Sequence, residues 1–219
     1  METRLHPQEE FKNRDGLSEL KNLYRNLGYV TLFAHARLAH APYRLLEEFV
    51  PRAGRILDLG CGYGLFANYL SMKSPAREVI GIELSRRKLR YANRGLNNVR
   101  FIEGDVTQTE LGSCDCIVMN HLLHHLRSFE EQEKILALCR EILEPNGRLL
   151  ICEVDRQPRW KFRVAQAVDA LLYFGDRIYY READEFSKLF RSLGFRVEQI
   201  MEAHQGVPMS HIIYSLSKG

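Results

Sequence analysis

The sequence lacks any apolar run long enough to span a bilayer, and its first residues lack the apolar core of a secretory signal. Its five cysteines are an odd number without the spacing of a disulfide framework, so we expect reduced thiols in the cytoplasm. Cys114 and Cys116 have no second cysteine pair or clustered histidines beside them, so we expect no metal. The net charge of +3 is too small to indicate a nucleic-acid partner.

Apolar runs of strand length alternate with helical patterns through the middle of the chain. The expected strands there are Arg55–Leu59, Glu78–Glu83, Val99–Glu103, Cys116–Asn120 and Arg148–Val154. A helix is expected near Arg86–Arg94, and Pro145–Gly147 are expected to form the turn into the last of these strands. This alternation indicates a parallel sheet with helices on both faces. Two later runs, Phe195–Met201 and His211–Leu216, can pair as an antiparallel hairpin. The sequence therefore predicts an α/β fold with a mostly parallel seven-stranded sheet and a C-terminal antiparallel hairpin.

A glycine-rich turn, Gly60-Cys61-Gly62-Tyr63-Gly64, follows the first of these strands. Glycines at alternate positions let a ligand approach the backbone closely, and the helical pattern that follows places this ligand at a helix N-terminus. A dinucleotide fingerprint would have its third glycine where this chain has Leu65. Asp58, just ahead of the turn, would repel a pyrophosphate. The turn therefore favours a ligand with a cationic group.

The run Asp58-Leu59-Gly60-Cys61-Gly62-Tyr63-Gly64 resembles the first motif of class I S-adenosylmethionine (SAM)-dependent methyltransferases. The resemblance extends over roughly residues 40 to 155. It implies a Rossmann-like fold, SAM as the cofactor and S-adenosylhomocysteine (SAH) as the product. SAM carries an ammonium and a sulfonium and no phosphate, which suits Asp58. The expected cofactor contacts here are Asp58, Gly60, Cys61, Gly62, Tyr63 and Gly64.

Two acids follow at spacings that suit a nucleoside. Glu83 ends a strand about twenty residues past the turn, where nucleotide-binding α/β folds place an acid that accepts both ribose hydroxyls. We include the adjacent Leu84 in the cofactor site. The segment Phe101–Val106 resembles the family's third motif, which implies that Asp105 accepts a hydrogen bond from the adenine amino group and that the Val106 amide faces the ring. The alternative for Asp105 is a simple Asx turn after the strand.

Polar side chains end the fourth strand, where open α/β sheets bind ligands. Asn120 and His121 are therefore expected near the methionine part of SAM. If a helix begins near Leu122, then His121, His124 and His125 share one face of it. A histidine there could take a proton from the acceptor. The alternatives are that these histidines cap the helix and pack in the core, and that positioning alone supplies the rate.

Two further side chains complete the candidate site. Tyr180 is expected at the edge of the cleft and is a catalytic candidate together with the three histidines. Arg37 or Arg44 could pair with the SAM carboxylate as a charge-assisted partner, and Arg37 is included among the cofactor residues. The alternative for both is a surface arginine.

The chain is expected to form one domain over residues 1–219. It comprises an N-terminal helical cap (1–50), a SAM-binding core (51–155), a lid-like insert (156–181) and a C-terminal helix with the strand hairpin (182–219). In the insert, the helically spaced residues that are expected to face the core or to form a lid are Trp160, Val164, Val168, Leu171 and Leu172. A basic amphipathic helix with aromatics can also lie on a membrane surface, so residues 158–175 are a candidate for peripheral membrane contact.

The leading prediction is an enzyme that methylates a small hydrophobic or aromatic molecule. The alternatives are an RNA or protein methyltransferase, a non-catalytic SAM-binding or partner-binding module, and a nicotinamide-binding Rossmann protein. The chain has Asn120-His121-Leu122-Leu123 where amino-directed nucleic-acid methyltransferases carry an Asn-Pro-Pro-Tyr type sequence. Ala41–Arg44 and His121–Leu126 more loosely resemble small bacterial methyltransferases of lipid and aryl-polyene biosynthesis. We expect a monomer or homodimer.

Overall fold

A computed structural model describes residues 16–172, 175, 177–203 and 208–219. The first fifteen residues of the predicted cap therefore lie outside the described residues, as do residues 173, 174 and 176 of the predicted insert. None of the helices in the described part of the chain is long and apolar enough to cross a membrane.

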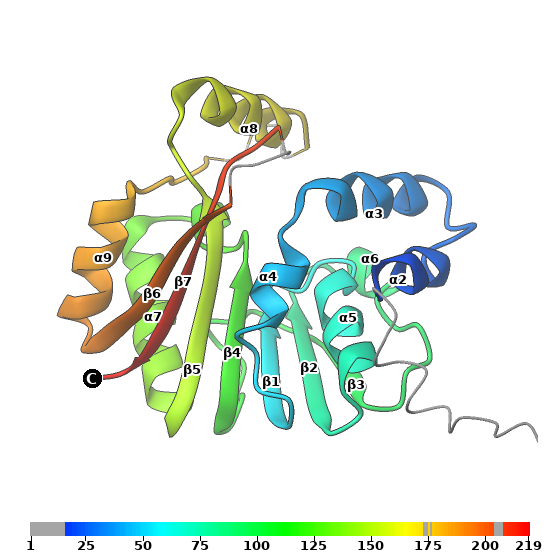
Figure 1. The fold of residues 1–219 in the computed structure, drawn as a ribbon, viewed down its shortest axis with the longest axis horizontal. Coiled ribbons are helices and arrows are strands. Elements are labelled where there is room, and N and C mark those ends of the chain that lie inside the picture. The colour runs from blue at the N-terminus through cyan, green and yellow to red at the C-terminus, as the bar shows by residue number, and fades with distance from the viewer. Residues whose placement is uncertain (1–15, 173–174, 176, 204–207) are drawn as a thin grey trace, which may run out of the picture.

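The centre of the fold is a seven-stranded sheet with the order β3-β2-β1-β4-β5-β7-β6 (Figure 1). Neighbouring strands from β3 to β5 pair in parallel, whereas β7 pairs antiparallel with both β5 and β6. The predicted fold class is thus confirmed, with the last strand inserted between β5 and β6. The strands are β1 (Gly54–Leu59), β2 (Arg77–Glu83), β3 (Val99–Glu103), β4 (Cys114–Asn120), β5 (Leu143–Val154), β6 (Phe195–Ala203) and β7 (His211–Lys218).

Helices cover both faces of the sheet because successive strand residues point to opposite sides. Leu57 and Leu59 of β1 pack in one core with α7 (Phe129–Ile142) and α9 (Ala183–Ser192). Ile56 lies in the other core. That second core is covered by α2 (Leu17–Leu23), α3 (Tyr29–His40), α4 (Tyr43–Glu47) and α5 (Leu65–Lys73).

Two local predictions were wrong. The helix expected over Arg86–Arg94 is the four-residue α6 (Arg86–Leu89), because Asn93 accepts a hydrogen bond from the Gly95 amide at 3.0 Å and offers the backbone a turn instead. The turn expected at Pro145–Gly147 lies inside β5. It forms a bulge, since Cys114 pairs with Leu143 whereas Cys116 pairs with Arg148.

The insert forms α8 (Arg159–Leu172), which lies with α3 beyond the same end of the sheet (Figure 1). The residues of α8 that were expected to face the core or to form a lid are buried only in part. Val164 and Val168 pack beside the buried Ala165, but Trp160 is 60% exposed and Leu171 is 81% exposed. The reason is that α8 packs on a small cluster with Val154 and Met209 and on neither main core. This cluster is large enough to bury only one side of the helix. Trp160 and Leu171 are eleven residues apart, about three helical turns, and therefore share the outer side.

Arg77, at the start of β2, joins the cap to the sheet. Its guanidinium is buried and donates to the carboxylate of Glu47 at 2.8 Å and to the carbonyl oxygens of Pro51, Leu70 and Val50 at 2.7, 3.1 and 3.0 Å. These partners come from α4, from the segment before β1 and from α5. The Glu47 carboxylate therefore balances the charge of the buried guanidinium, and the three carbonyl oxygens satisfy its remaining hydrogen bonds.

Removing this guanidinium leaves the Glu47 carboxylate and three carbonyls without their buried donor. We expect Arg77→Met to lower the free energy of unfolding by about 3–5 kcal/mol in urea titrations. Arg100→Met is the matched control, because Arg100 pairs with Glu78 at 3.0 Å on the surface, and it should cost less than about 1 kcal/mol. Equal losses for the two variants would contradict this account of Arg77.

Candidate functional site

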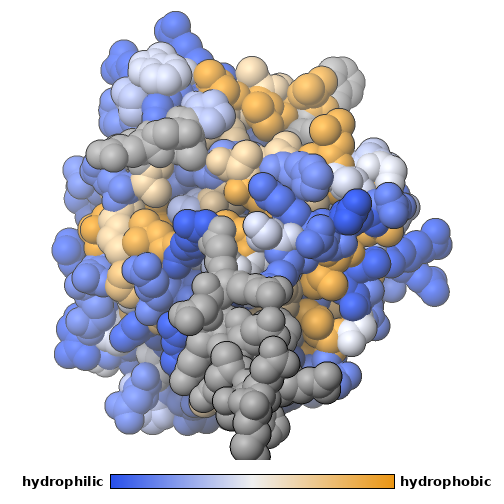
Figure 2. All heavy atoms as spheres, turned by 45° about the vertical axis from the view of Figure 1, so that its right-hand side comes forward, coloured by the Kyte–Doolittle hydropathy of each residue, from blue (hydrophilic) through white to orange (hydrophobic). Residues whose placement is uncertain are grey.

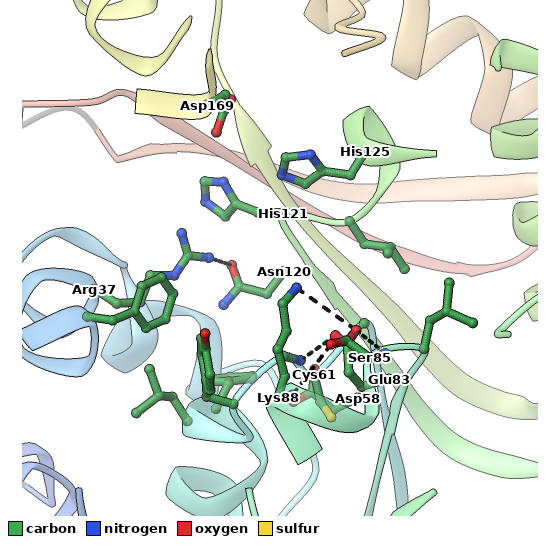
Figure 3. Close-up of a pocket in the computed structure, with 18 of the residues that line it drawn as sticks. Arg37, Asp58, Cys61, Glu83, Ser85, Lys88, Asn120, His121, His125 and Asp169 are labelled. Carbon is green, nitrogen blue, oxygen red and sulfur yellow. Dashed lines mark hydrogen bonds and ion pairs between the residues drawn. The ribbon is translucent and has the colours of Figure 1, made fainter. Parts of the chain in front are cut away.

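A cavity of about 1090 Å³ lies at the carboxyl ends of β1 to β5, between α3 and α8 (Figure 3). Figure 3 shows Asp58, Cys61 and Glu83 gathered at one end and His125 and Asp169 at the other. We call the end with Asp58 the donor end and the end with Asp169 the acceptor end, after the methyl donor and methyl acceptor that the sequence resemblance implies. Ligands of open α/β sheets bind at this edge, because neighbouring strand ends bring their polar residues together there.

The glycine turn shapes the donor end. Gly60, Gly62 and Gly64 have φ values of 70°, 59° and 73°, which other residues adopt only with strain. A Cβ on Gly60 would lie 2.7 Å from Leu122, and one on Gly64 would lie 2.8 Å from Phe101, whereas a Cβ on Gly62 would meet nothing within 4 Å. Gly60 and Gly62 line the cavity and Gly64 does not. Gly62 therefore leaves space for a ligand, Gly60 lets the turn approach Leu122 at the cavity wall, and Gly64 lets the turn pack on β3.

Asp58 brings a buried carboxylate to the cavity wall. Burial raises its pKa to about 7, and the negative charge of Glu83 contributes to the same shift. Its Oδ2 atom has no hydrogen-bond partner within the described ranges. A buried acceptor without a donor is costly unless a ligand supplies one. The site therefore fits a ligand that brings a cationic donor.

Glu83 is held in place by two backbone amides. Gly62 donates to its Oε2 at 2.9 Å, and Ser85 donates to its Oε1 at 2.8 Å. The Lys88 ammonium lies 3.9 Å from Oε1. Each carboxylate oxygen can accept a further hydrogen bond, so the oriented group suits a pair of ligand hydroxyls. Leu84, beside it, also lines the cavity.

Asp105 and Val106 line the donor end after β3. The Asx turn considered from the sequence is present, because the Thr107 amide and hydroxyl donate to Asp105 Oδ1 at 2.9 and 2.7 Å. These bonds hold the pKa of Asp105 below its usual value. The second oxygen has weaker partners, with Gln108 Nε2 at 3.4 Å and Arg127 at 3.7 Å. The turn thus orients the carboxylate, and the adenine contact stays a prediction.

Arg37 lies on the cavity wall between the two ends. Its guanidinium donates to Asn120 Oδ1 at 3.3 Å, which joins α3 to the end of β4 (Figure 3). Burial, together with the charge of Arg37, lowers the pKa of His40 to about 4. Arg37, Asn120 and His40 line the cavity, whereas Arg44 does not. Of the two arginines considered, Arg37 is therefore the one placed to meet a ligand carboxylate.

The three candidate histidines do not share a helix face, so that prediction was wrong. His121 follows β4 with a φ of 60°, and only Leu123–His125 forms a short 3-10 helix, η2. The reason is Glu153 of β5, which accepts a hydrogen bond from the Leu123 amide at 2.8 Å and contacts His124 Nδ1. His124 is thereby buried, while His121 and His125 line the cavity.

Burial keeps the two cavity-lining imidazoles neutral. It lowers the pKa of His125 to about 2, with the neighbouring His124 as the second cause. It also holds the pKa of His121 well below the usual value, and Arg37 acts in the same direction. Both rings therefore present unprotonated nitrogens, which accept hydrogen bonds and are weak bases at neutral pH.

Tyr180 lies behind the cavity rather than on its wall. Its ring stacks on His124 with 5.3 Å between centroids, and its hydroxyl donates to Asp169 Oδ2. Asp169 itself lines the cavity. Sequence reasoning missed both Glu153 and Asp169. A lone acid in the buried run Ile151–Val154 was an available signal for Glu153, whereas an acid in an amphipathic helix gives no signal for Asp169.

A model of the methyltransferase domain family matches residues 31–200. The chain belongs to this family. The demethylmenaquinone methyltransferase of Thermus thermophilus is 32% identical over 159 residues, which cover 69% of this chain and 70% of that protein. The ubiquinone biosynthesis O-methyltransferase of Neisseria meningitidis is 27% identical over 131 residues, 56% of this chain and 53% of that protein.

Solved structures show that this methyltransferase domain has the fold of its family. The SAH-bound methyltransferase of calicheamicin biosynthesis superposes with a TM-score of 0.67 at 20% identity, covering 94% of this chain and 59% of that one. The SAM complex of human N-acetylserotonin methyltransferase gives 0.64 at 17% identity, covering 93% and 56%. The chain thus spans little more than half the length of these relatives.

The raised pKa of Asp58 predicts a pH dependence for binding of SAM to this methyltransferase domain. Only the ionised carboxylate attracts the cation, so affinity should rise with pH through about 7. Calorimetry should give a dissociation constant roughly eightfold weaker at pH 6 than at pH 7.5. Asp58→Asn should bind more weakly at pH 7.5 and lose most of this dependence. An Asp58→Asn variant with the wild-type pH profile would exclude Asp58 as its source.

Proposed function

We propose that the protein transfers a methyl group from SAM to a small apolar molecule with an aromatic ring. This proposal rests mainly on one observation: a single cavity contains two ends with different chemistry. The donor end has oriented carboxylates, whereas the acceptor end combines the polar His125 and Asp169 with apolar residues that include Val154, Val168 and Met209. Single ligand sites commonly measure about 300–1,000 Å³, so a cavity of about 1090 Å³ has room for a donor and a small acceptor.

The donor end supplies one partner for each part of SAM. Asp58 offers its unpartnered oxygen to a cationic group, and Glu83 offers two oriented oxygens to the ribose hydroxyls. Asp105 and Val106 are assigned to adenine, and Arg37 to the carboxylate. The family match and the SAM- and SAH-containing structural relatives support SAM as the ligand.

The reaction needs little proton chemistry from the protein. An acceptor atom attacks the sulfonium methyl, the sulfur–carbon bond breaks, and its electron pair stays on sulfur in SAH. Holding the two reactants in line and excluding water supplies much of the rate. His121 and His125 contribute as neutral hydrogen-bond acceptors, because a pKa of about 2 makes His125 a poor general base.

The relatives support an aromatic acceptor through their names. One is named for demethylmenaquinone and another for ubiquinone biosynthesis. Others are named for trans-aconitate and malonyl-acyl-carrier protein, which are acidic acceptors. The apolar residues of the acceptor end and the negative charge of Asp169 favour the first group here. An acceptor from lipid or aryl-polyene biosynthesis, a cytoplasmic location and a monomer or homodimer stay predictions.

The reaction is tested by SAH release from SAM in the presence of an alkyl-substituted catechol or hydroxynaphthoquinol, with trans-aconitate as the acidic comparison. We expect SAH with the aromatic probes only. Val168→Arg, which fills the acceptor end, should lower kcat/KM by about tenfold or more with an unchanged dissociation constant for SAM. Gln166→Arg, on the exposed side of α8, is the matched control. SAM binding without SAH release from any probe would favour the non-catalytic module.

We also propose that α8 touches a membrane surface, from which an apolar acceptor is drawn. Its outer side exposes Trp160, Leu171 and the cationic Arg163. Helix α8 lies at the top of the molecule in Figure 1, and Figure 2 shows apolar side chains exposed among hydrophilic ones toward the top. Residues 173 and 174 of the predicted contact segment lie outside the described residues.

Trp160 is the only tryptophan in the chain, so intrinsic tryptophan fluorescence reports on α8 alone. We expect a blue shift with phosphatidylglycerol vesicles and a smaller one with phosphatidylcholine vesicles. Leu171→Glu should weaken partitioning about thirtyfold, because burial of a leucine is worth about 2 kcal/mol. Ile200→Glu, on β6, is the control. An emission spectrum that neither kind of vesicle changes would exclude membrane contact through α8.

A further inference from the structure

We propose that His124, His125 and Asp169 form a binding site for a divalent transition metal at the acceptor end of the cavity. One ligand atom from each residue lies within 4.8 Å of the others. Two imidazoles and one carboxylate are a donor set that proteins use for Zn²⁺ and Fe²⁺. The expectation of no metal was based on Cys114 and Cys116. The sequence gives no signal for this cluster, because the histidine pair and Asp169 are far apart in the chain and meet only when α8 lies over η2.

The orientation of His124 is the first argument. The Glu153 carboxylate contacts His124 Nδ1 and also accepts from the Leu123 amide, so the buried ring cannot turn freely. Histidines that bind metals usually donate their second nitrogen to such a carboxylate, which fixes the tautomer and leaves the other nitrogen for the ion. Glu153 therefore prepares His124 Nε2 as a ligand.

The distance across the cluster is the second argument. His124 Nε2 has no hydrogen-bond partner within the residues described, and Asp169 Oδ2 lies 3.8 Å away. This separation is too long for a hydrogen bond. Ligand atoms of a tetrahedral ion with bonds of about 2.0 Å are about 3.3 Å apart, so a metal fits between the two groups after a small inward shift.

The position of the cluster indicates what the ion would contact. His125 and Asp169 both line the cavity, and Figure 3 shows the two side chains at its acceptor end. Three protein ligands leave a fourth position open, as in catalytic zinc sites. An acceptor hydroxyl or carbonyl oxygen can take this position and be held at the acceptor end of the same cavity that contains the donor end. This role rests on the proposed function, whereas binding of the metal does not.

The experiment uses the full chain without an affinity tag, treated with a chelator and then freed of it. Zn²⁺ alone is titrated by calorimetry, and Co²⁺ alone is followed by its visible ligand-field absorption. We expect one ion per chain with a dissociation constant in the micromolar range or tighter. His125→Ala and Asp169→Asn should each weaken binding about tenfold or more, with circular dichroism confirming that both variants fold.

Two controls separate ligation from a structural role. Tyr180→Phe removes the hydroxyl that donates to Asp169 but keeps all three ligands, so it should bind the ion at least as tightly as the wild type. His35→Ala removes an exposed histidine of α3 and should change nothing. Absence of a one-to-one complex, or wild-type affinity in both ligand variants, would overturn the metal site.

Activity is measured separately, so that the two proposals can fail independently. One-to-one Zn²⁺ binding without SAH release from any acceptor would support the metal site and contradict the proposed function. SAH release by a chain that binds no Zn²⁺ would overturn the metal site alone.

Discussion

The donor end depends on the hydrogen bond from the Gly62 amide to the Glu83 carboxylate, 2.9 Å long. The turn follows β1 and Glu83 ends β2, so this bond fixes the ends of two neighbouring strands against each other. Glu83 is 8% exposed, and a charged acceptor in such surroundings makes a strong bond. The register between β2 and β3 then fixes the position of Asp105, because Glu83 lies opposite Glu103, two residues before Asp105.

The residues that the sequence placed at this end of the cavity do line it, because the determinants of their positions are local. A glycine turn after an apolar strand needs only its own residues to be recognised, and parallel pairing brings the ends of the following strands to the same edge. Asp58 and Glu83 were expected at this edge from their places at the ends of strands, and Asp105 from the resemblance of its segment to the family's third motif. All three line the cavity. Gly64 is the exception, because only the packed Phe101 shows that it serves the fold.

The acceptor end could not be predicted in the same way because long-range contacts decide it. Which histidines face the cavity depends on Glu153, a strand away from His124. The helical spacing around Trp160 was correct, but the depth of burial depends on how little of α8 the sheet covers. Periodicity identifies a helix and gives no measure of how large a surface it meets.

The two ends of the cavity also differ in how freely they can change during evolution. The donor end is made by strand ends inside the sheet, where a substitution such as one at Gly60 would disturb the packing against Leu122. The acceptor end takes Val168 and Asp169 of its wall from α8, which stands beyond the end of the sheet (Figure 1). Mutations there can alter the choice of acceptor while the methyl-donor site and the stability of the sheet stay intact. This division gives a physical reason why relatives of one fold can carry names that refer to quinones, acids and carrier proteins.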